Sequence, residues 1–278
     1  MSGAPMHRFR IGSAEVGGPR LLVIAGPCVV ESVEMCVGVA RHLKDLCEAR
    51  DLPFVFKSSY RKANRSSGGA FSGLPMEEAL GALARVRDEV GVPVLTDVHE
   101  EAEAVVAARV ADCLQIPAFL SRQTGLLQAA ARTGRAVNVK KGQFMAPDDM
   151  EHAAAKITAA GGQRVLLTER GTTFGYHDLV VDFRGIVRMR EFGWPVVYDA
   201  THSLQSPGGA GSGGERQFAF PLMRAAVACG VDGLFFEAHP EPARALSDAA
   251  TQLPLAESEA FLDEALRIRS AVVERAHA

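Results

Sequence analysis

Basic side chains stand at the ends of several apolar segments of the chain, where they could bind the oxygens of a phosphate or a carboxylate. Four of them belong to the second, fifth and sixth segments or to the loop directly after: Lys57, Lys62, Lys140 and Arg170. Lysine and arginine at such points suit a doubly ionised anion. The run Asn64-Arg65-Ser66 adds a second group of anion donors. Two groups indicate two phosphorylated reactants or one long bisphosphate, and the sequence leaves both open.

A second set of side chains offers sulfur, nitrogen and oxygen donors that could bind a metal ion. Cys28 ends the first apolar segment, His202 ends the seventh and Glu237 lies in the eighth. Asp248 comes after the eighth and could supply a fourth ligand. A buried cysteine alone is most often a small hydrophobic residue, and a lone histidine is most often structural. Together the four suit a borderline divalent ion such as zinc, iron, cobalt or manganese.

Eight short apolar segments must position these side chains. They cover residues 21–28, 53–59, 93–99, 113–119, 136–142, 164–171, 195–203 and 233–240. Amphipathic stretches with helical spacing lie between them, so the pattern alternates strand and helix. Eight such units predict an α/β fold, a (β/α)8 TIM barrel, over residues 1–278 as a single domain. Residues 1–20 are expected to form a short N-terminal cap.

A closed barrel makes the first, seventh and eighth strands neighbours, which brings the metal-ligand candidates into one corner. The alternative is a doubly wound open sheet. We favour the barrel because the strands number eight and no dinucleotide-binding fingerprint opens the chain. The glycine-rich run at 208–214 lacks the context of a phosphate-binding loop, and we expect a mobile lid there.

Composition narrows the class of protein. The chain has 278 residues, 47% hydrophobic and 23% charged, which excludes a disordered tail or a disulfide-dense scaffold. A formal net charge of −3 argues against a long nucleic-acid groove. The five cysteines form no C-x-x-C pair, and no apolar run approaches the roughly 20 residues of a membrane helix. We expect a cytoplasmic protein with reduced thiols and with neither nucleic acid nor membrane as a partner.

Seven strings along the barrel carry a family resemblance. They are GPCVVES, FKSSYRKANRSS, LQIPAFLSRQT, NVKKGQF, LTERGTTFGYHDLVVDFR, YDATHSLQ and EAHPEPARALSDAATQLPL. From about Leu21 to Leu255 the chain resembles the 3-deoxy-D-manno-octulosonate 8-phosphate synthases. The resemblance implies a homotetrameric barrel, a transferase that condenses phosphoenolpyruvate with D-arabinose 5-phosphate and water. The products are 3-deoxy-D-manno-octulosonate (KDO) 8-phosphate, used in lipopolysaccharide biosynthesis, and inorganic phosphate.

The resemblance also implies roles for individual residues. Those that would hold phosphoenolpyruvate are Lys57, Ser59, Lys62, Gln115, Lys140 and Arg170. Those that would hold the sugar phosphate, partly across a subunit interface, are Asn64, Arg65 and Ser66. The metal-independent branch of the family carries asparagine where this chain has Cys28. The chain therefore resembles the metal-dependent branch, with Mn, Fe, Zn, Co or Cd held by Cys28, His202, Glu237 and Asp248.

Three residues are candidates for the chemical step. The methylene carbon of phosphoenolpyruvate would attack the sugar aldehyde while water adds to the enolpyruvyl carbon. Lys62 or His202 would move a proton, and Asp97 would orient the water. The metal would act as Lewis acid and template. The sequence does not rank these roles.

Three other functions compete with this interpretation. The sister family makes 3-deoxy-D-arabino-heptulosonate 7-phosphate from erythrose 4-phosphate, but it usually carries Lys-Pro-Arg-Thr where this chain continues Lys62-Ala63-Asn64-Arg65-Ser66. A non-catalytic sugar-phosphate-binding barrel would tend to lose some strand-end residues, and none of the expected set is missing. A class II aldolase usually relies on several histidine ligands, whereas this chain offers one convincing candidate.

Overall fold

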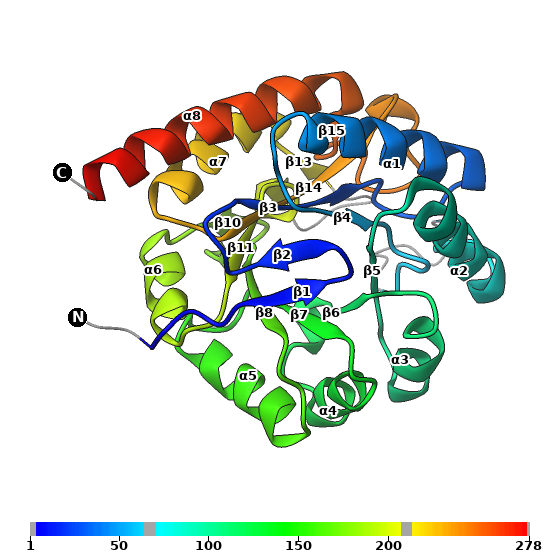
Figure 1. Cartoon of the computed structure of the whole chain (residues 1–278), viewed down its shortest axis with the longest axis horizontal. Coiled ribbons are helices and arrows are strands. Elements are labelled where there is room, and N and C mark those ends of the chain that lie inside the picture. Colours follow the sequence, from blue (N-terminus) through cyan, green and yellow to red (C-terminus); the bar gives the residue numbers. More distant parts are fainter. Residues whose placement is uncertain (1–3, 64–70, 207–212, 277–278) are drawn as a thin grey trace.

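Eight parallel strands close into a barrel in the computed structural model, which describes residues 4–63, 71–206 and 213–276 (Figure 1). The barrel strands are β3 (Leu22–Gly26), β4 (Phe54–Lys57), β5 (Val94–Asp97), β6 (Cys113–Ile116), β7 (Ala136–Lys140), β8 (Val165–Glu169), β11 (Val196–Asp199) and β14 (Gly233–His239). β14 pairs with β3 on one side and with β11 on the other, which closes the ring. The predicted barrel is confirmed, and the open-sheet alternative is wrong.

In the described part of the chain, eight α-helices surround the strands. They are α1 (Val33–Glu48), α2 (Met76–Arg85), α3 (Glu101–Ala107), α4 (Thr124–Arg132), α5 (Asp149–Ala159), α6 (Arg184–Glu191), α7 (Ala219–Ala228) and α8 (Ser258–Ala276). α1 shows why they form. The Ser32 side chain accepts a hydrogen bond from the backbone N–H of Met35 and caps the helix, and its apolar residues at helical spacing are buried against the barrel. None of the described helices is long and apolar enough to cross a membrane.

Alternation along each strand divides the barrel interior into layers, because side chains two residues apart point to the same side of the sheet. The lowest layer is wholly apolar and buried: Ile24, Val55, Leu95, Cys113, Ala136, Leu166, Val197 and Phe235. Two residues further along, the strands carry Lys57, Asp97, Gln115, Asn138, Thr168, Asp199 and Glu237. The inward-facing side chains therefore change from apolar to polar over two residues of each strand.

Gly26 occupies the position in this polar layer that belongs to β3. A Cβ atom there would lie 2.1 Å from the carbonyl oxygen of Lys57, so only glycine fits. The close approach of the β3 and β4 backbones at this point therefore requires glycine.

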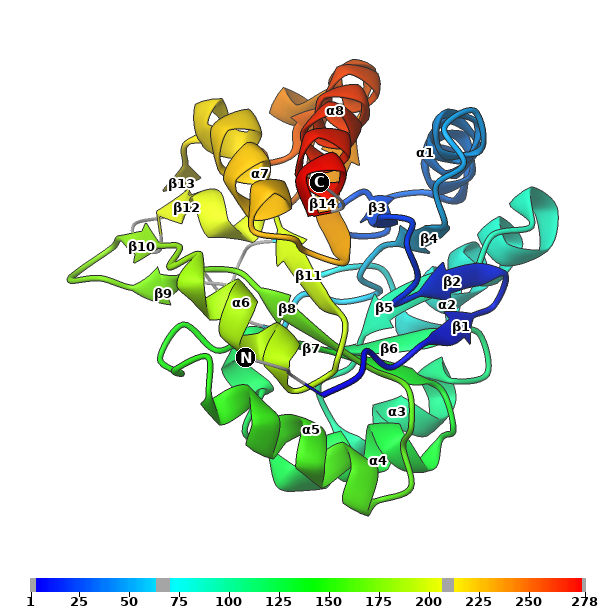
Figure 2. The same ribbon diagram turned by 60° about the vertical axis from the view of Figure 1, so that its left-hand side comes forward.

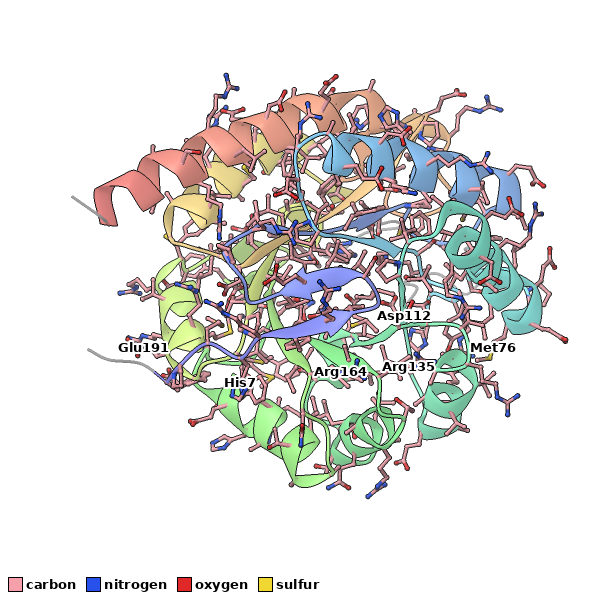
Figure 3. All side chains as sticks on the ribbon, viewed as in Figure 1. His7, Met76, Asp112, Arg135, Arg164 and Glu191 are labelled. Carbon is pink, nitrogen blue, oxygen red and sulfur yellow. The ribbon has the colours of Figure 1, made fainter. Side chains whose placement is uncertain are left out.

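An N-terminal hairpin closes the bottom of the barrel. β1 (Phe9–Ile11) pairs with β2 (Ala14–Val16), and Ile11, Ala14 and Val16 join the apolar layer. Figure 3 looks onto this end, where Asp112, Arg135 and Arg164, which precede β6, β7 and β8, lie around the hairpin. The predicted cap is confirmed, and the site must lie at the opposite end.

Short elements beyond the eight units were not predicted. β9 (Thr172–Thr173) pairs with β10 (Leu179–Val180), and β12 (Gln205–Ser206) pairs with β13 (Gly213–Gly214). Figure 2 shows both pairs at the end of the barrel away from β1 and β2. β15 (Leu253–Pro254) extends the ladder of β14. The predicted lid at 208–214 has its last two residues in β13, and residues 207–212 lie outside the described part of the chain.

Candidate active site

The carboxyl ends of the strands gather most of the candidate residues into one buried cluster. Lys57, Ser59, Asp97, Gln115, Lys140, Arg170 and Glu237 are all buried there. Asn64, Arg65 and Ser66 lie outside the described residues, so their role stays a prediction. The cluster has two parts: a metal corner, defined as Cys28, His202, Glu237 and Asp248, and a polar floor that runs across β4 to β8.

The metal corner forms where β3, β14 and β11 meet. One ligand atom each of Cys28, Glu237 and Asp248 lies within 4.8 Å of the other two, and all three residues are buried. Nε2 of His202 is 3.6 Å from Glu237 Oε1 and 3.7 Å from Asp248 Oδ2. Glu237 Oε2 is buried and has no hydrogen-bond partner among the described residues. Cys28, Glu237 and Asp248 thus converge, while His202 lies beside the two carboxylates and is not part of the three-residue group. The unpartnered Glu237 Oε2 is left for a ligand.

Electrostatics in the corner favour a cation. Burial, with the neighbouring carboxylates of Asp248 and Glu237, raises the pKa of the Cys28 thiol well above its ordinary value. A positive ion reverses this effect because metal-bound cysteine is a thiolate. The donor set therefore fits a divalent metal ion. Such an ion would explain why a thiol and two carboxylates are buried side by side.

A loop after β14 delivers Asp248 to the corner. Its backbone takes the left-handed conformation, with a φ of +48°, which is uncommon outside glycine. Gln252 fixes the loop against β3: its Oε1 accepts from the backbone N–H of Cys28 at 3.1 Å, and its Nε2 donates to the carbonyl of Ser247 at 2.7 Å. Gln252 was not predicted from the sequence, because its partner Cys28 is 224 residues away along the chain.

His202 is held by a carboxylate on its far side. Its Nδ1 is 2.8 Å from Asp199 Oδ2, and its backbone N–H donates to Asp199 Oδ1 at 2.8 Å. Nε2 therefore faces the corner. A carboxylate behind a metal-ligating histidine is a common arrangement that fixes the ring.

The lysines predicted to bind an anion are also counter-ions of buried carboxylates. Lys57 Nζ lies 2.5 Å from Glu237 Oε1 and donates to the carbonyl of Cys28 at 3.0 Å. Lys140 Nζ lies 2.7 Å from Asp199 Oδ2 and 4.0 Å from the centre of the Phe235 ring. Burial disfavours a charged Lys62, but the charges of Cys28, Glu237 and Asp97 outweigh it and raise its pKa.

The polar floor is a continuous chain of hydrogen bonds across five strand ends. Ser59 Oγ and Gln115 Nε2 both donate to the carboxylate of Asp97. Gln115 Oε1 accepts from Asn138 Nδ2 at 2.9 Å, and Asn138 Oδ1 accepts from Thr168 Oγ at 2.6 Å. Burial opposes the charge on Asp97, yet Lys57, Lys62, His99 and Lys140 lower its pKa below the ordinary value. This series of hydrogen bonds thus ends at the ionised carboxylate of Asp97.

Arg170 has a free donor in the site. Its Nη2 donates to Gln205 Oε1 at 2.8 Å, while its Nη1 is buried without a partner among the described residues. A buried unpaired guanidinium nitrogen is costly, and an anionic oxygen would satisfy it. Its neighbour Glu169 pairs with Lys141 outside the barrel, at 3.5 Å.

The chain is similar to known proteins over most of its length. The model of the DAHP synthetase I family matches residues 9–274. A 2-dehydro-3-deoxyphosphooctonate aldolase of Trichlorobacter lovleyi is 54% identical over 255 residues, 91% of this chain and 94% of the relative. Proteins of the same name from Cyanothece sp. and Koribacter versatilis are each 52% identical, over 257 residues (92% of this chain, 94% of the relative) and 269 residues (95% and 96%).

Proposed function

The chain belongs to the DAHP synthetase I family, and from this premise we propose that it is a metal-dependent 2-dehydro-3-deoxyphosphooctonate aldolase. It condenses phosphoenolpyruvate with D-arabinose 5-phosphate and water, and it releases KDO 8-phosphate and inorganic phosphate. The reaction is a transferase step of KDO and lipopolysaccharide biosynthesis. The observation that carries the activity is the identity of 52% to 54% with relatives of that name, over more than nine-tenths of the chain.

The sugar substrate follows from the relatives, not from the family description. That description names heptulosonate synthesis, which uses erythrose 4-phosphate, whereas each of the three relatives bears the phosphooctonate name. The five-carbon sugar phosphate is therefore the substrate. Asn64, Arg65 and Ser66 are the residues that we expect to bind it.

Phosphoenolpyruvate is assigned to the buried cluster at the strand ends. We assign its phosphate and carboxylate to Lys57, Ser59, Lys62, Gln115, Lys140 and Arg170. The unpaired Nη1 of Arg170 and the four cationic side chains support this assignment. Holding both reactants in line supplies about 7 to 11 kcal/mol of the barrier in well-oriented reactions.

The reaction forms a carbon–carbon bond and a carbon–oxygen bond to water, and it breaks the carbon–oxygen bond to the phosphate. The methylene carbon of phosphoenolpyruvate attacks the aldehyde carbon, and water adds to the enolpyruvyl carbon. The phosphate then leaves with its bridging oxygen and takes up the proton of the new hydroxyl group, which becomes the ketone. Asp97 orients the water, and the proton that the water loses passes to the aldehyde oxygen through Lys62 or His202. Nδ1 of His202 is engaged by Asp199, which leaves Lys62 the less constrained of the two.

We assign a divalent ion, of Mn, Fe, Zn, Co or Cd, to the metal corner. Cys28, Glu237 and Asp248 would hold it with His202 as the fourth ligand. The support is the convergence of the donors and the orphaned Glu237 Oε2. A bound ion supplies Lewis acidity and a fixed point for an oxygen of the reactants.

One experiment tests the substrate and the metal together. Phosphate release is measured with arabinose 5-phosphate and, separately, with erythrose 4-phosphate, before chelation, after it, and after each metal is added back. We expect turnover with the five-carbon sugar alone, lost on chelation and restored by metal. Turnover that survives complete chelation would refute metal dependence, and a preference for erythrose 4-phosphate would refute the substrate.

Metal content gives a second readout that does not depend on activity. Cys28→Ala is expected to lower bound metal measured by elemental analysis. Cys229→Ala is the matched control, because Cys229 lies at the end of α7, away from the metal corner. Equal metal content in the two variants would exclude Cys28 as a ligand.

The homotetramer and the cytoplasmic location stay predictions. Phe119 and Phe144, in the loops after β6 and β7, are 56% and 57% exposed, which is consistent with surfaces that a second copy covers. Analytical ultracentrifugation of the purified protein measures the assembly directly.

A further inference from the structure

We propose that Asn138 and Thr168 are positioning residues for the reaction, which set the amide orientation of Gln115 and so aim one of its N–H donors at phosphoenolpyruvate. Neither residue is a candidate from the sequence, and neither is expected to touch a substrate. The inference rests on the proposed function, because it needs Gln115 to bind phosphoenolpyruvate.

The hydrogen bonds of the polar floor have only one consistent direction. An ionised carboxylate accepts and cannot donate, so Asp97 must face the Nε2 side of Gln115. The Oε1 side of Gln115 then needs a donor, and Asn138 Nδ2 supplies it at 2.9 Å. This turns Asn138 Oδ1 toward β8, where the hydroxyl of Thr168 donates to it at 2.6 Å.

Thr168 is therefore the last residue in a series of hydrogen bonds that begins at Asp97. Asn138 and Thr168 are both fully buried, so water does not replace a lost partner without a change in packing. Without the Thr168 hydroxyl, Asn138 Oδ1 has no donor, and the cost of its amide rotating by half a turn falls. A rotated Asn138 presents its oxygen to Gln115 Oε1, which drives the Gln115 amide out of its orientation.

Gln115 has one donor to spare in the native arrangement. Its amide nitrogen carries two hydrogens, and the contact with Asp97 uses one. The second is the donor that we assign to an oxygen of phosphoenolpyruvate. Loss of one hydrogen bond of ordinary strength weakens binding about tenfold.

Thr168→Val and Thr168→Ser make a matched pair for the test. Valine keeps the shape and removes the hydroxyl, while serine keeps the hydroxyl and removes a methyl group. We expect Thr168→Val to raise the KM for phosphoenolpyruvate about tenfold and to leave the KM for arabinose 5-phosphate within twofold. Thr168→Ser is expected to stay within twofold for both.

Asn138→Ala provides a second route to the same result if Thr168→Val folds poorly. It is expected to raise the KM for phosphoenolpyruvate at least as much. In the double variant, the valine adds no further change, because Thr168 acts only through Asn138. Thermal unfolding is followed in every variant.

Two results would overturn the inference. One is a Thr168→Val enzyme that unfolds at a lower temperature but keeps the KM for phosphoenolpyruvate, since the floor would then be structural only. The other is an equal rise in both KM values, or an equal effect of serine and valine, since packing would then explain the change.

Calorimetric binding of phosphoenolpyruvate separates this inference from the proposed function. Wild-type protein that binds phosphoenolpyruvate without turning over either sugar would refute the function alone. The ratio of Kd values for Thr168→Val and wild type then decides the inference: a ratio near ten supports it and a ratio near one refutes it. Wild-type protein that does not bind phosphoenolpyruvate refutes both.

Discussion

Lys57 and Glu237 form a buried ion pair across β3, with Lys57 Nζ 2.5 Å from Glu237 Oε1 and with side-chain exposures of 1% and 0%. The pair joins the two functional parts of the site, because Lys57 is a candidate anion ligand and Glu237 a candidate metal ligand. It also keeps the carboxylate ionised: burial opposes the charge on Glu237, but Lys57, His202 and Lys62 lower its pKa. One contact therefore serves both charge balance and the expected chemistry.

Breaking this pair from one side is expected to be costly. Lys57→Met leaves the Glu237 carboxylate buried beside other carboxylates, and we expect the free energy of unfolding to fall by about 3 to 5 kcal/mol. Urea denaturation of the metal-free protein measures the change. The double variant Lys57→Met/Glu237→Leu is expected to recover most of the loss. A single variant within 1 kcal/mol of wild type would contradict the account.

Asp97 gives the protein a specific dependence of stability on pH. Its folded-state pKa lies below the unfolded value, because the surrounding lysines outweigh burial. Its contribution to stability is therefore complete above the unfolded pKa, about 3.9, and is lost as the pH falls toward the folded value. We expect the stability of Asp97→Asn to vary less than that of wild type between about pH 5 and pH 2.

Asp149→Asn is the control for this comparison, since Asp149 lies exposed at the start of α5. Chemical denaturation across the pH range measures both variants. If Asp97→Asn and Asp149→Asn show the same dependence on pH, Asp97 is not the group responsible.

The ion pair of Lys141 and Glu169, which lies outside the barrel, is expected to affect the binding of phosphoenolpyruvate through Arg170. Lys141 Nζ donates to the carbonyl of Gly171 at 3.3 Å and to Thr172 Oγ at 2.9 Å, and so holds the chain directly after Arg170. Lys141→Met is expected to raise the KM for phosphoenolpyruvate about tenfold, as the loss of one hydrogen bond does.

Hydrogen exchange locates this effect. Residues 171–180, which include β9 and β10, are expected to exchange faster in Lys141→Met than in wild type. Lys156→Met is the control, because Lys156 Nζ donates to the carbonyl of Arg122 on the surface of α5. Unchanged exchange together with an unchanged KM would remove Lys141 from the positioning of Arg170.

The N-terminal hairpin is expected to contribute stability without chemistry. Ile11 is fully buried in the apolar layer, at the end of the barrel away from the site. Ile11→Ala should cost about 2 to 5 kcal/mol of unfolding free energy and leave kcat unchanged. Val187→Ala, at a position 48% exposed on α6, is the control. A loss of kcat in Ile11→Ala at a temperature where the protein stays folded would show that the hairpin affects the site.

The spacing of apolar residues along the sequence was enough to predict most of the fold. Each predicted apolar segment contains its observed strand, from 21–28 around β3 to 233–240 around β14. The predicted ends run too far, because an extended loop and a strand look alike in one sequence. The helix after β4 does not keep one regular period: α2 ends at Arg85, and a π-helical turn with Val86 and Val90 buried covers Val86–Val90 before Gly91. That turn depends on packing that periodicity does not record.

Candidate site residues could be predicted where the residue type itself indicates a chemical role. Cysteine, histidine and the two carboxylates stood out by their chemistry. The closed barrel brings Cys28, Glu237 and Asp248 together, and His202 lies beside the two carboxylates. Asn138, Thr168, Gln205 and Gln252 did not stand out, because neutral polar residues occur anywhere in a sequence. Their roles depend on which partner lies across the ladder. Spacing offered a partial signal, since Asn138 and Thr168 each lie two residues before a predicted anion ligand.

The separation of Cys28 and Asp248 by 220 residues has a consequence for the order of events during synthesis. A growing chain that has reached β11 contains Cys28 and the region of His202, but neither Glu237 nor Asp248. The Gln252 side chain, which ties the two ends of the corner together, is made later still. The proposed metal site is therefore complete only after residues 1–252 have been made. A shorter nascent polypeptide lacks either one of the candidate ligands or the side chain that fixes them.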